Sequence, residues 1–365
     1  MKVLSVIGTR PEAIKLAILY KLMTNNDFFN CILCHTGQHT SLVDSVFREF
    51  GIEADICLNL PSIETDELVN KMSWMLKSLN TIMKFHSPDL VIVQGDTLSA
   101  YCAAMAAYLN KIKLAHVEAG LRTYRKYHPF PEEVLRSSID KIAHFHFAPS
   151  KLAVTHLINE GCPEENIYLT GNTGVDAFLY AKRQGQLKEG ALSDIMRFLE
   201  WKRSEGRNVL LLTMHRRENH GVFMHNVFCE LTKYINRKDA AIICYKHPHP
   251  NLAAFYNTKE RHDNICYADP LPYSSFIHLL EQVDLILTDS GGLQEEAAYI
   301  PKPVIVLREA TERQEVLLSN ALLVNQKSKL IISIHEMLDK KISVSDAYGS
   351  GEASQRIMEI LKKVL

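Results

Sequence analysis

Residues 287–298 hold the pattern that most directly suits chemistry, because small polar residues follow an apolar run and precede a helix-like stretch. The pattern predicts a buried strand, a tight turn and a helix start, whose backbone N–H groups and positive end suit a phosphate. A pyrophosphate could approach the backbone closely at Ser290, Gly291 and Gly292. Glu296 follows in the first helical turn, where a carboxylate can accept hydrogen bonds from ribose hydroxyls. The alternative interpretation is an ordinary capped helix after a core strand.

A second pattern, residues 8–15, follows the first apolar run of the chain and opens a helix, with Pro11 near the first helical position. Arg10 and Lys15 place two cations at this helix start, where the backbone is already electropositive. That placement favours an anion-binding role for both side chains. The alternative is surface charge beside a tight turn.

Three carboxylates of the first half follow apolar runs or begin a helix, where general acid–base chemistry could use them. Asp96 follows the run that ends at Gln94, and its alternative role is to cap the next helix. Glu118 ends another apolar run, which is an unusual place for a charge. Its alternative role is an ion pair with Arg122, and the two roles are compatible.

The third carboxylate, Glu132, begins a helix in which Glu133 and Arg136 are spaced for an ordinary helical ion pair. Glu132 therefore points elsewhere and is available to a ligand. In the second half, His215 follows an apolar run and precedes two arginines, which suits contact with a phosphate or transfer of a proton. Arg313 lies in a charged segment after the last apolar run, where it could reach the same ligand or belong to a solvated loop.

The composition is that of an ordinary globular enzyme and argues against several classes of partner. The chain has 365 residues, 47% hydrophobic and 23% charged, which predicts two domains. The net charge is −1 and no lysine- or arginine-rich block occurs, so nucleic acid and anionic membranes are poor candidate partners. No apolar run approaches the roughly 18 residues of a membrane span. The N-terminal run, residues 1–8, lacks a cleavage site and predicts a first strand in a cytoplasmic protein.

Eight cysteines are scattered along the chain, and only Cys31 and Cys34 are close in sequence. A zinc site would need a second such pair, and the sequence has none. We therefore expect the cysteines to act as small hydrophobic residues and expect no metal.

Short apolar runs alternate with helix-like stretches, which predicts an α/β protein with doubly wound parallel sheets. The expected strands are Lys2–Ile7, Cys31–His35, Leu90–Gln94, Lys113–Val117, His144–Ala148, Asn166–Thr170, Asn208–Thr213, Ala240–Tyr245, Asn264–Tyr267, Val283–Thr288 and Pro303–Leu307. The alternation breaks at the polar stretch Lys182–Arg207, so we expect an interdomain boundary within residues 172–206. Glu352–Leu365 is expected to form a closing amphipathic helix. Every candidate pattern falls at the carboxyl end of an expected strand, which is where such sheets bind ligands.

The segments GTRPEAIK, GDT, HVEAGLRT, PEE, TGNTGVDA, HRREN, DSGGLQEEA and REATERQE occur in an order that resembles the non-hydrolysing UDP-N-acetylglucosamine 2-epimerases. The resemblance spans essentially the whole chain. It implies the GT-B fold, in which two Rossmann-like parallel-sheet domains face each other across a cleft. Applied here, it implies a domain 1–172 with the catalytic carboxylates, a UDP-binding domain 173–345 and a helix 346–365 that crosses back. It also implies a homodimer that needs no metal or redox cofactor.

The same resemblance assigns roles to individual residues. It places at the reacting sugar Asp96, Glu118, Glu132 and His215. It places on the UDP of the substrate Arg10, Lys15, Phe276, Ser290, Gly291, Gly292, Glu296 and Arg313.

The sequence departs from the family pattern at several places, one of which is residues 346–351, DAYGSG where NPYGDG is common. Leu271 stands near the expected uracil site, where Gln is common, and residues 246–251 read KHPHPN in place of the usual run. Ser41 and Lys71 stand where Gln and Arg are common in a second, allosteric UDP-GlcNAc site, although Gln38 and His39 match that site. The sequence therefore argues against allosteric activation.

The implied reaction is the reversible conversion of UDP-GlcNAc to UDP-ManNAc, as a step in surface polysaccharide precursor synthesis. Anti elimination of UDP would give 2-acetamidoglucal, and syn re-addition would give the epimer. Alternatives are a 2-epimerase of a related deoxy or diacetamido UDP-sugar and a hydrolysing 2-epimerase that releases ManNAc. A GT-B glycosyltransferase would not need so many acid–base residues, and a UDP-sugar-binding regulator would need none.

Overall fold

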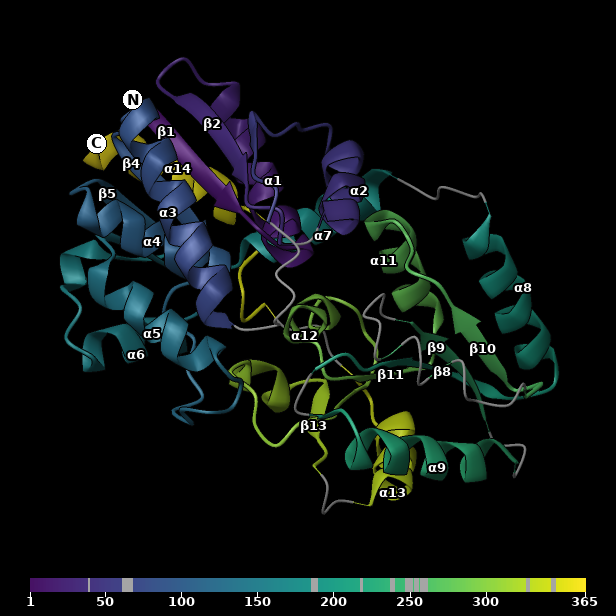
Figure 1. Cartoon of the computed structure of the whole chain (residues 1–365). Coiled ribbons are helices and arrows are strands. Elements are labelled where there is room, and N and C mark those ends of the chain that lie inside the picture. Colours follow the sequence, from purple (N-terminus) through teal and green to yellow (C-terminus); the bar gives the residue numbers. More distant parts are fainter. Residues whose placement is uncertain are drawn as a thin grey trace. The chain divides into compact units, whose positions relative to one another are not determined.

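The computed structural model describes residues 1–38, 40–60, 68–184, 190–216, 219–236, 240–246, 252, 256, 262–325, 329–342 and 346–365. The chain forms two compact units (Figure 1). Unit 1 consists of Met1–Leu179 and Ala347–Leu365, and unit 2 consists of Tyr180–Asp346. Each unit has its own parallel sheet.

Unit 1 is built on a seven-stranded sheet of order β3-β2-β1-β4-β5-β6-β7, in which every pairing is parallel. The strands are β1 (Lys2–Ile7), β2 (Asn30–His35), β3 (Ile56–Cys57), β4 (Leu90–Gln94), β5 (Lys113–Val117), β6 (Phe145–Ala148) and β7 (Ile167–Leu169). The central β4, with the sequence LVIVQ, is buried along its whole length. Such continuous burial is expected where helices cover both faces of a parallel sheet.

The helices of unit 1 connect these strands in the crossover pattern of a doubly wound fold. They are α1 (Arg10–Thr24), α2 (Thr40–Phe50), α3 (Leu68–His86), α4 (Leu98–Leu109), α5 (Glu132–Ile142), α6 (Lys151–Asn159), α7 (Thr173–Gln184) and α14 (Ala353–Val364), with a 3-10 turn at Glu164–Asn166. Helix α7 continues past Leu179 into unit 2. The alanine-rich α4 packs against α3, α5 and β4, and its small side chains are almost all buried.

Unit 2 repeats this architecture with a six-stranded sheet of order β10-β9-β8-β11-β12-β13, again parallel throughout. Its strands are β8 (Asn208–Thr213), β9 (Ala240–Tyr245), β10 (Ile265–Ala268), β11 (Leu285–Thr288), β12 (Val304–Val306) and β13 (Ala321–Leu323). Its helices are α8 (Ala191–Ser204), α9 (Val222–Asn236), α11 (Tyr273–Gln282), α12 (Gly291–Ala297) and α13 (Leu330–Asp339), with a 3-10 turn at Gln314–Leu318.

The predicted pair of Rossmann-like parallel sheets is confirmed, and β1, β4, β5, β8 and β9 have the predicted bounds. Two edge strands, β3 and β13, are absent from the prediction because two or three residues carry no readable periodicity. The polar stretch Lys182–Arg207 does not simply connect the two sheets, because α8 occupies most of its described part. That the two domains face each other across a cleft stays a prediction. Within the described residues, no helix combines the length and apolar character that spanning a bilayer requires.

The C-terminal helix returns to the first unit, as Figure 1 shows by the yellow α14 among the purple and blue elements. There α14 packs against α1. The carboxylate of Asp176, on α7, accepts hydrogen bonds from the backbone N–H groups of Ala353 (3.1 Å) and Ser354 (2.6 Å) at the start of α14. Burial raises the pKa of Asp176, and the hydrogen bonds from Ser354 and Ala353 oppose that rise.

Replacing Asp176 by alanine should detach this helix start. The variant Asp176→Ala leaves the two N–H groups of α14 without their acceptor, so we expect a loss of about 1–2 kcal/mol in the free energy of unfolding. Urea denaturation followed by circular dichroism measures the loss. The matched variant Asp176→Asn keeps one acceptor oxygen and should lose less; equal losses in the two variants would contradict the capping role.

Candidate functional site

The turn after β1 is held by a buried carboxylate. Glu12 accepts hydrogen bonds from the backbone N–H groups of Gly8 (3.0 Å) and Thr9 (2.7 Å) and from the Thr9 hydroxyl (2.7 Å). Its second oxygen accepts from the hydroxyl of Thr97 (2.6 Å), in the turn after β4. Burial raises the pKa of Glu12 to about 7, although the hydrogen bonds from Thr97, Thr9 and Gly8 act to lower it. Glu12 therefore joins two turns at the carboxyl end of the sheet, and Arg10 begins α1 beside it.

Glu118 directly follows β5 in a strained backbone conformation, with φ +69°, and its side chain is buried. Its carboxylate forms an ion pair with the ammonium group of Lys15, on α1, and accepts a hydrogen bond from the side-chain amide of Gln94 (2.8 Å). The structure thus brings together Lys15 and Glu118, which the family resemblance assigned to different parts of the substrate. Strain of this kind at a non-glycine residue is typical of functional sites.

The alternative partner of Glu118, Arg122, is engaged elsewhere, so that interpretation is wrong. The Arg122 guanidinium donates to the Glu160 carboxylate at 2.7 and 2.8 Å and to Asp140 Oδ2 at 2.7 Å. Asp140 also accepts from the backbone N–H of Gly120 (3.2 Å) and lies 2.6 Å from the His116 ring. Burial alone would raise the pKa of Asp140, but His116 and Arg122 outweigh it and lower that pKa to about 2.

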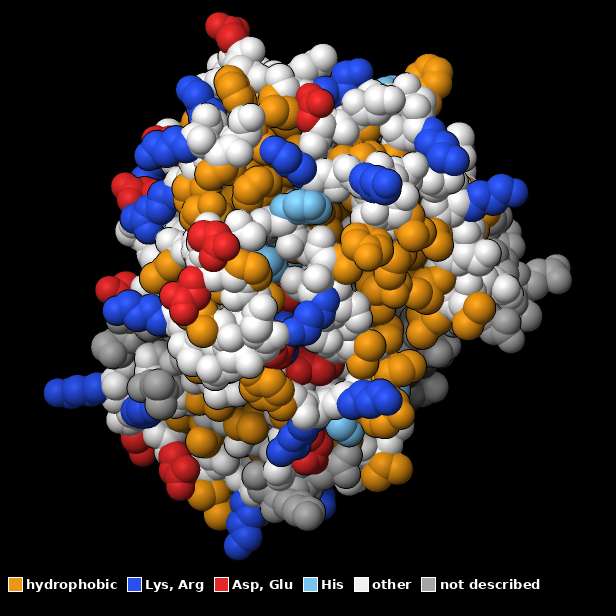
Figure 2. All heavy atoms as spheres, turned by 90° about the vertical axis from the view of Figure 1, so that its left-hand side faces the viewer, with side chains coloured by type: hydrophobic (Ala, Val, Ile, Leu, Met, Phe, Trp, Pro, Cys, Tyr) orange, Lys and Arg blue, Asp and Glu red, His pale blue; other side chains and the backbone are white. Residues whose placement is uncertain are grey.

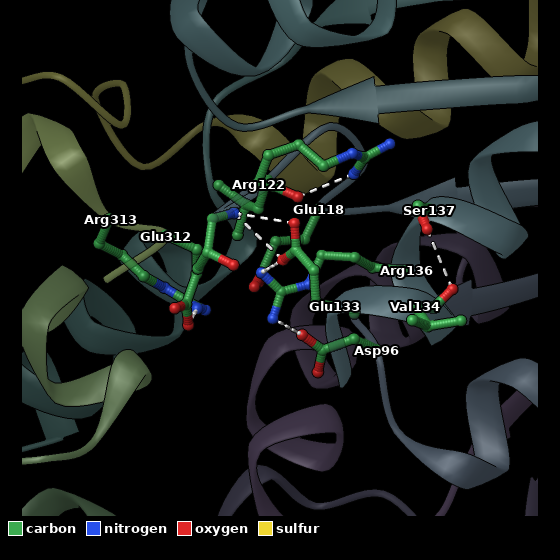
Figure 3. Close-up of polar contacts among 12 residues, drawn as sticks. Asp96, Glu118, Arg122, Glu133, Val134, Arg136, Ser137, Glu312 and Arg313 are labelled. Carbon is green, nitrogen blue, oxygen red and sulfur yellow. Dashed lines mark hydrogen bonds and ion pairs between the residues drawn. The ribbon is translucent and has the colours of Figure 1, made fainter. Parts of the chain in front are cut away.

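Asp96 does not cap α4, as the capping alternative required. Thr97 is the N-cap of that helix, and its hydroxyl accepts from the N–H of Ala100 (3.0 Å). The Asp96 carboxylate instead pairs with the guanidinium of Arg136, on α5 (Figure 3). Arg136 also lies 3.3 Å from Glu133, which confirms the predicted helical ion pair.

Glu133 also holds a loop, an interaction that the sequence did not predict. Its carboxylate accepts hydrogen bonds from the backbone N–H groups of Thr123 (3.0 and 3.1 Å) and Tyr124 (2.8 Å), in the loop that follows β5. Figure 3 shows Glu133 and Arg136 side by side, with Arg136 directed at Asp96. Glu132, the first residue of α5, is only partly buried.

In unit 2, the buried carboxylate of Asp289 organises the ends of two strands. It accepts from the backbone N–H groups of His215 (3.0 Å) and Arg216 (2.9 Å) and from the side-chain amide of Asn219 (2.9 Å). The His215 ring lies 3.2 Å from the same carboxylate, and about a third of the side chain is exposed. His215 therefore sits on a fixed backbone with an anionic neighbour, while Arg217 and Glu218 lie outside the described residues.

The turn after β11 has the predicted strand–turn–helix form. Ser290 is the N-cap of α12, its hydroxyl accepting from the N–H of Leu293 at 3.4 Å, and Gly291 and Gly292 begin the helix. A side chain at Gly292 would meet no atom within 4 Å, whereas one at Gly291 would lie 2.9 Å from the guanidinium of Arg313. The turn is therefore open at Gly292 and packed against Arg313 at Gly291.

Arg313 is almost completely buried beside α12 and is paired with two carboxylates. Its Nε donates to Glu295 (2.7 Å), and its Nη1 pairs with Glu312, which also accepts from Arg308 (3.0 Å). The structure therefore gives Arg313 a place in a charged network rather than in a solvated loop.

The remaining predicted nucleotide residues lie on α11 and α12. Glu296 accepts a hydrogen bond from the hydroxyl of Tyr273 (2.7 Å), and the Phe276 ring packs on Tyr245 with centroids 4.7 Å apart. Leu271 turns its side chain into the core, while its backbone N–H donates to the hydroxyl of Tyr245 (2.6 Å). Residues 247–251, the other departure near this position, lie outside the described residues, as does His39.

Among the described residues, no group of three or more His, Cys, Asp and Glu side chains is placed to hold a metal ion. All eight cysteines are free thiols. Four are buried, in agreement with the prediction of small core residues, whereas Cys57 and Cys229 are exposed.

Within each unit, the structure groups predicted residues around buried carboxylates. In unit 1 these are Glu12, Glu133 and Asp140, and in unit 2 the central one is Asp289. None was a predicted site residue, because their partners are backbone N–H groups and distant side chains. For Glu12 alone the sequence carried a signal, because Thr9 and Glu12 have the spacing of a capping box.

The chain matches proteins of one family along nearly its whole length. The sequence model described as UDP-N-acetylglucosamine 2-epimerase matches residues 21–362. The UDP-N-acetylglucosamine 2-epimerase of Campylobacter jejuni is 38% identical over 377 residues, covering 99% of this chain and 97% of the relative. The MnaA–UDP co-structure from S. aureus has a TM-score of 0.91 at 35% identity, covering 99% and 96% of the two chains. The UDP-GlcNAc 2-epimerase from Neisseria meningitidis bound to UDP-GlcNAc has a TM-score of 0.88 at 32% identity, covering 100% of both.

The contrast between Gly291 and Gly292 gives a matched test of the packed turn. Gly291→Ala pushes a methyl group against Arg313 and should lower the free energy of unfolding by about 1–3 kcal/mol. Gly292→Ala adds the same methyl group in open space and should change stability by less than about 0.5 kcal/mol. Thermal and urea unfolding of the two variants measures the difference. Equal stabilities would show that Arg313 does not pack as described.

Proposed function

The chain belongs to the UDP-N-acetylglucosamine 2-epimerase family, and from that premise we propose that it interconverts UDP-GlcNAc and UDP-ManNAc without hydrolysing them. One observation carries the proposal. The carboxylates that this chemistry needs, on Asp96, Glu118 and Glu132, are all present on one unit, at the carboxyl end of its sheet or at the start of α5. A protein that only bound the nucleotide sugar would need none of them.

The reaction needs these carboxylates because the C2 hydrogen of the sugar is not acidic by itself. As UDP leaves C1, positive charge grows there and the neighbouring C2–H becomes acidic. Removal of this proton gives 2-acetamidoglucal and UDP by anti elimination. Syn re-addition of UDP, with a proton delivered to the other face of C2, then gives the epimer. Each direction requires an acid–base group on either face of C2.

Glu118 suits the role of base. The ammonium group of Lys15 and the amide of Gln94 both stabilise the ionised carboxylate, which is the form that accepts a proton. Glu132, partly buried at the start of α5, suits the second acid–base role. Asp96 is held to the same helix by its pair with Arg136. We assign neither glutamate to a particular face of C2.

The nucleotide is assigned to unit 2, with Arg10 and Lys15 as additional cations from α1. The N–H groups after Ser290 and the ring of His215 suit the departing pyrophosphate, whose charge grows in the transition state. Glu296 would accept from the ribose hydroxyls and Phe276 would stack by the uracil. Arg313 would act from within its buried pairs with Glu295 and Glu312.

Two finer alternatives share this machinery. A hydrolysing 2-epimerase would release ManNAc and UDP from the same intermediate. A 2-epimerase of a deoxy or diacetamido UDP-sugar would use the same carboxylates with another sugar. The Campylobacter jejuni relative is described as a UDP-N-acetylglucosamine 2-epimerase and the Neisseria meningitidis structure as bound to UDP-GlcNAc, which favours that substrate.

We also propose a homodimer, a cytoplasmic location and a role in surface polysaccharide precursor synthesis, as the family resemblance implies. Support for a subunit interface comes from unit 1, which exposes Phe85 (83%), Tyr108 (53%) and Leu109 (65%) at the ends of α3 and α4. Figure 2 shows hydrophobic side chains gathered in patches on one face of the molecule. Such patches are typical of surfaces that a partner covers.

The decisive experiment is incubation of UDP-GlcNAc with the protein in deuterated water. Because the C2 proton is removed and replaced from solvent, we expect deuterium at C2 of UDP-ManNAc and of the recovered UDP-GlcNAc. Proton NMR over time follows both sugars and detects any free ManNAc. Accumulation of free ManNAc would identify a hydrolysing enzyme, and absence of both exchange and UDP-ManNAc would refute the proposed reaction.

Removing either proposed acid–base group should slow the chemical step. Glu118→Gln and Glu132→Gln keep the size of the side chain but cannot accept a proton, so we expect kcat to fall by about two to four orders of magnitude. A coupled assay of UDP-ManNAc formation measures kcat. Glu164→Gln, an exposed change in the same unit, is the control and should leave turnover unchanged. Near-normal turnover in both test variants would remove the two glutamates from acid–base roles.

A further inference from the structure

A histidine that the proposed chemistry does not use is completely buried behind the predicted catalytic residues. His116, on β5, makes two hydrogen bonds with its ring and has no exposed surface. Its Nε2 lies 2.8 Å from the backbone carbonyl of Gly95, and its Nδ1 lies 2.6 Å from the carboxylate of Asp140, on α5. Both bonds have ordinary lengths for strong hydrogen bonds.

The two partners determine how many protons this pair holds. A backbone carbonyl only accepts hydrogen bonds, so Nε2 must carry a proton and donate a hydrogen bond to the carbonyl of Gly95. An ionised carboxylate also only accepts, so Nδ1 must donate to Asp140 as well. His116 is then an imidazolium. The alternative, in which Asp140 is a neutral acid, is disfavoured because the backbone N–H of Gly120 and the guanidinium of Arg122 also donate to this carboxylate. Burial alone would raise the pKa of Asp140, but His116, Arg122 and His146 outweigh it and lower that pKa to about 2.

The charges around the pair also favour an imidazolium. Arg122 and His146 face Asp140 from the loop after β5 and from β6, and Glu160 faces Arg122 from the end of α6. The carboxylates of Asp140 and Glu160 carry two negative charges, whereas the guanidinium of Arg122 carries one positive charge. A positively charged His116 makes the buried group neutral, which lowers the cost of burying it.

The position of the pair connects it to both predicted catalytic turns. Gly95, whose carbonyl accepts the hydrogen bond from Nε2, is joined directly to Asp96. Gly120, whose N–H donates to Asp140 Oδ2 at 3.2 Å, lies two residues after Glu118. One buried ion pair thus holds the turn after β4 and the turn after β5, although their carboxylates come from different strands.

We propose that His116 and Asp140 form a buried imidazolium–carboxylate pair that positions Asp96 and Glu118 for reaction at the sugar. The positioning part of this inference rests on the proposed epimerase function; the charge state of the pair does not. His116 is a positioning residue, because it touches the turns that carry the carboxylates and not the sugar. A displacement of such turns by about 1 Å can lower a rate by about a hundredfold. An ion pair that holds both turns in place therefore affects the rate without touching the sugar.

The charge state is tested directly on the unmodified full chain. With ¹⁵N-labelled histidine, NMR at pH 8 reports which ring nitrogens carry protons, and His116→Gln identifies the signals of His116 by their loss. We expect both ring nitrogens of His116 to be protonated at that pH. A His116 ring with one bare nitrogen would overturn the imidazolium pair.

The positioning role is tested by kinetics with a matched control. His146 is equally buried and pairs with His116 across the neighbouring strand, but its ring contacts the backbone carbonyl of Asp140 and not the carboxylate or Gly95. We expect His116→Gln to lower kcat by about 10- to 100-fold with little change in the KM for UDP-GlcNAc, because the turns move but the nucleotide contacts remain. We expect His146→Gln to retain kcat within about threefold, since it touches neither turn.

The outcomes separate the inference from the function on which it rests. Equal losses of kcat in both variants, or equal rises in KM, would assign His116 to packing alone and overturn the positioning role. Wild-type turnover in His116→Gln would do the same. If the wild-type protein fails to epimerise any UDP-sugar, the proposed function falls, while the NMR result still decides whether the buried pair exists.

Discussion

In both units, buried carboxylates accept hydrogen bonds from the backbone N–H groups of turns at the carboxyl end of a parallel sheet. Glu12 does so after β1, Glu133 and Asp140 after β5, and Asp289 after β8. Turns at this edge must leave N–H groups without partners in the sheet, and a buried N–H without an acceptor costs about 1–3 kcal/mol. A carboxylate satisfies several at once. After β5 the same arrangement places negative charge behind the turn, and Arg136 and Arg122 offset it at Glu133 and Asp140.

Helix α5 shows how one element meets this constraint several times. Glu133, Arg136 and Asp140 occupy positions that repeat every three or four residues, and therefore share one buried face. Glu133 binds the loop after β5, and Arg136 binds Asp96. Asp140 binds His116, Gly120 and Arg122. Because Glu132 begins the same helix, the three proposed acid–base carboxylates are all fixed, directly or through a turn, by α5.

Much of this architecture could be predicted from the sequence, and the reason is the long apolar strands. β1, β4, β5, β8 and β9 are buried on both faces, so their runs of Val, Ile and Leu are visible without any structure. The motifs at their ends could be found for the same reason. The partners of those motifs could not be predicted, because they are far away in the sequence. The Lys15–Glu118 pair spans 103 residues, and the His215–Asp289 contact spans 74. Arg122 shows the error that results: the sequence offered Glu118 as its nearby partner, whereas the fold supplies Asp140 and Glu160.

The charged network beside α12 explains how the turn to which we assign the phosphates can coexist with acidic neighbours. Glu295 and Glu312 are buried near the helix start and would repel a pyrophosphate if they were unopposed. Arg313 pairs with both, and Arg308 pairs with Glu312, so two guanidinium groups balance two carboxylates. The positive end of the short helix is then not cancelled by net negative charge behind it. By this argument Arg313 favours anion binding through the carboxylates it neutralises, whether or not its guanidinium touches the nucleotide. Its burial against Gly291 is consistent with that structural role.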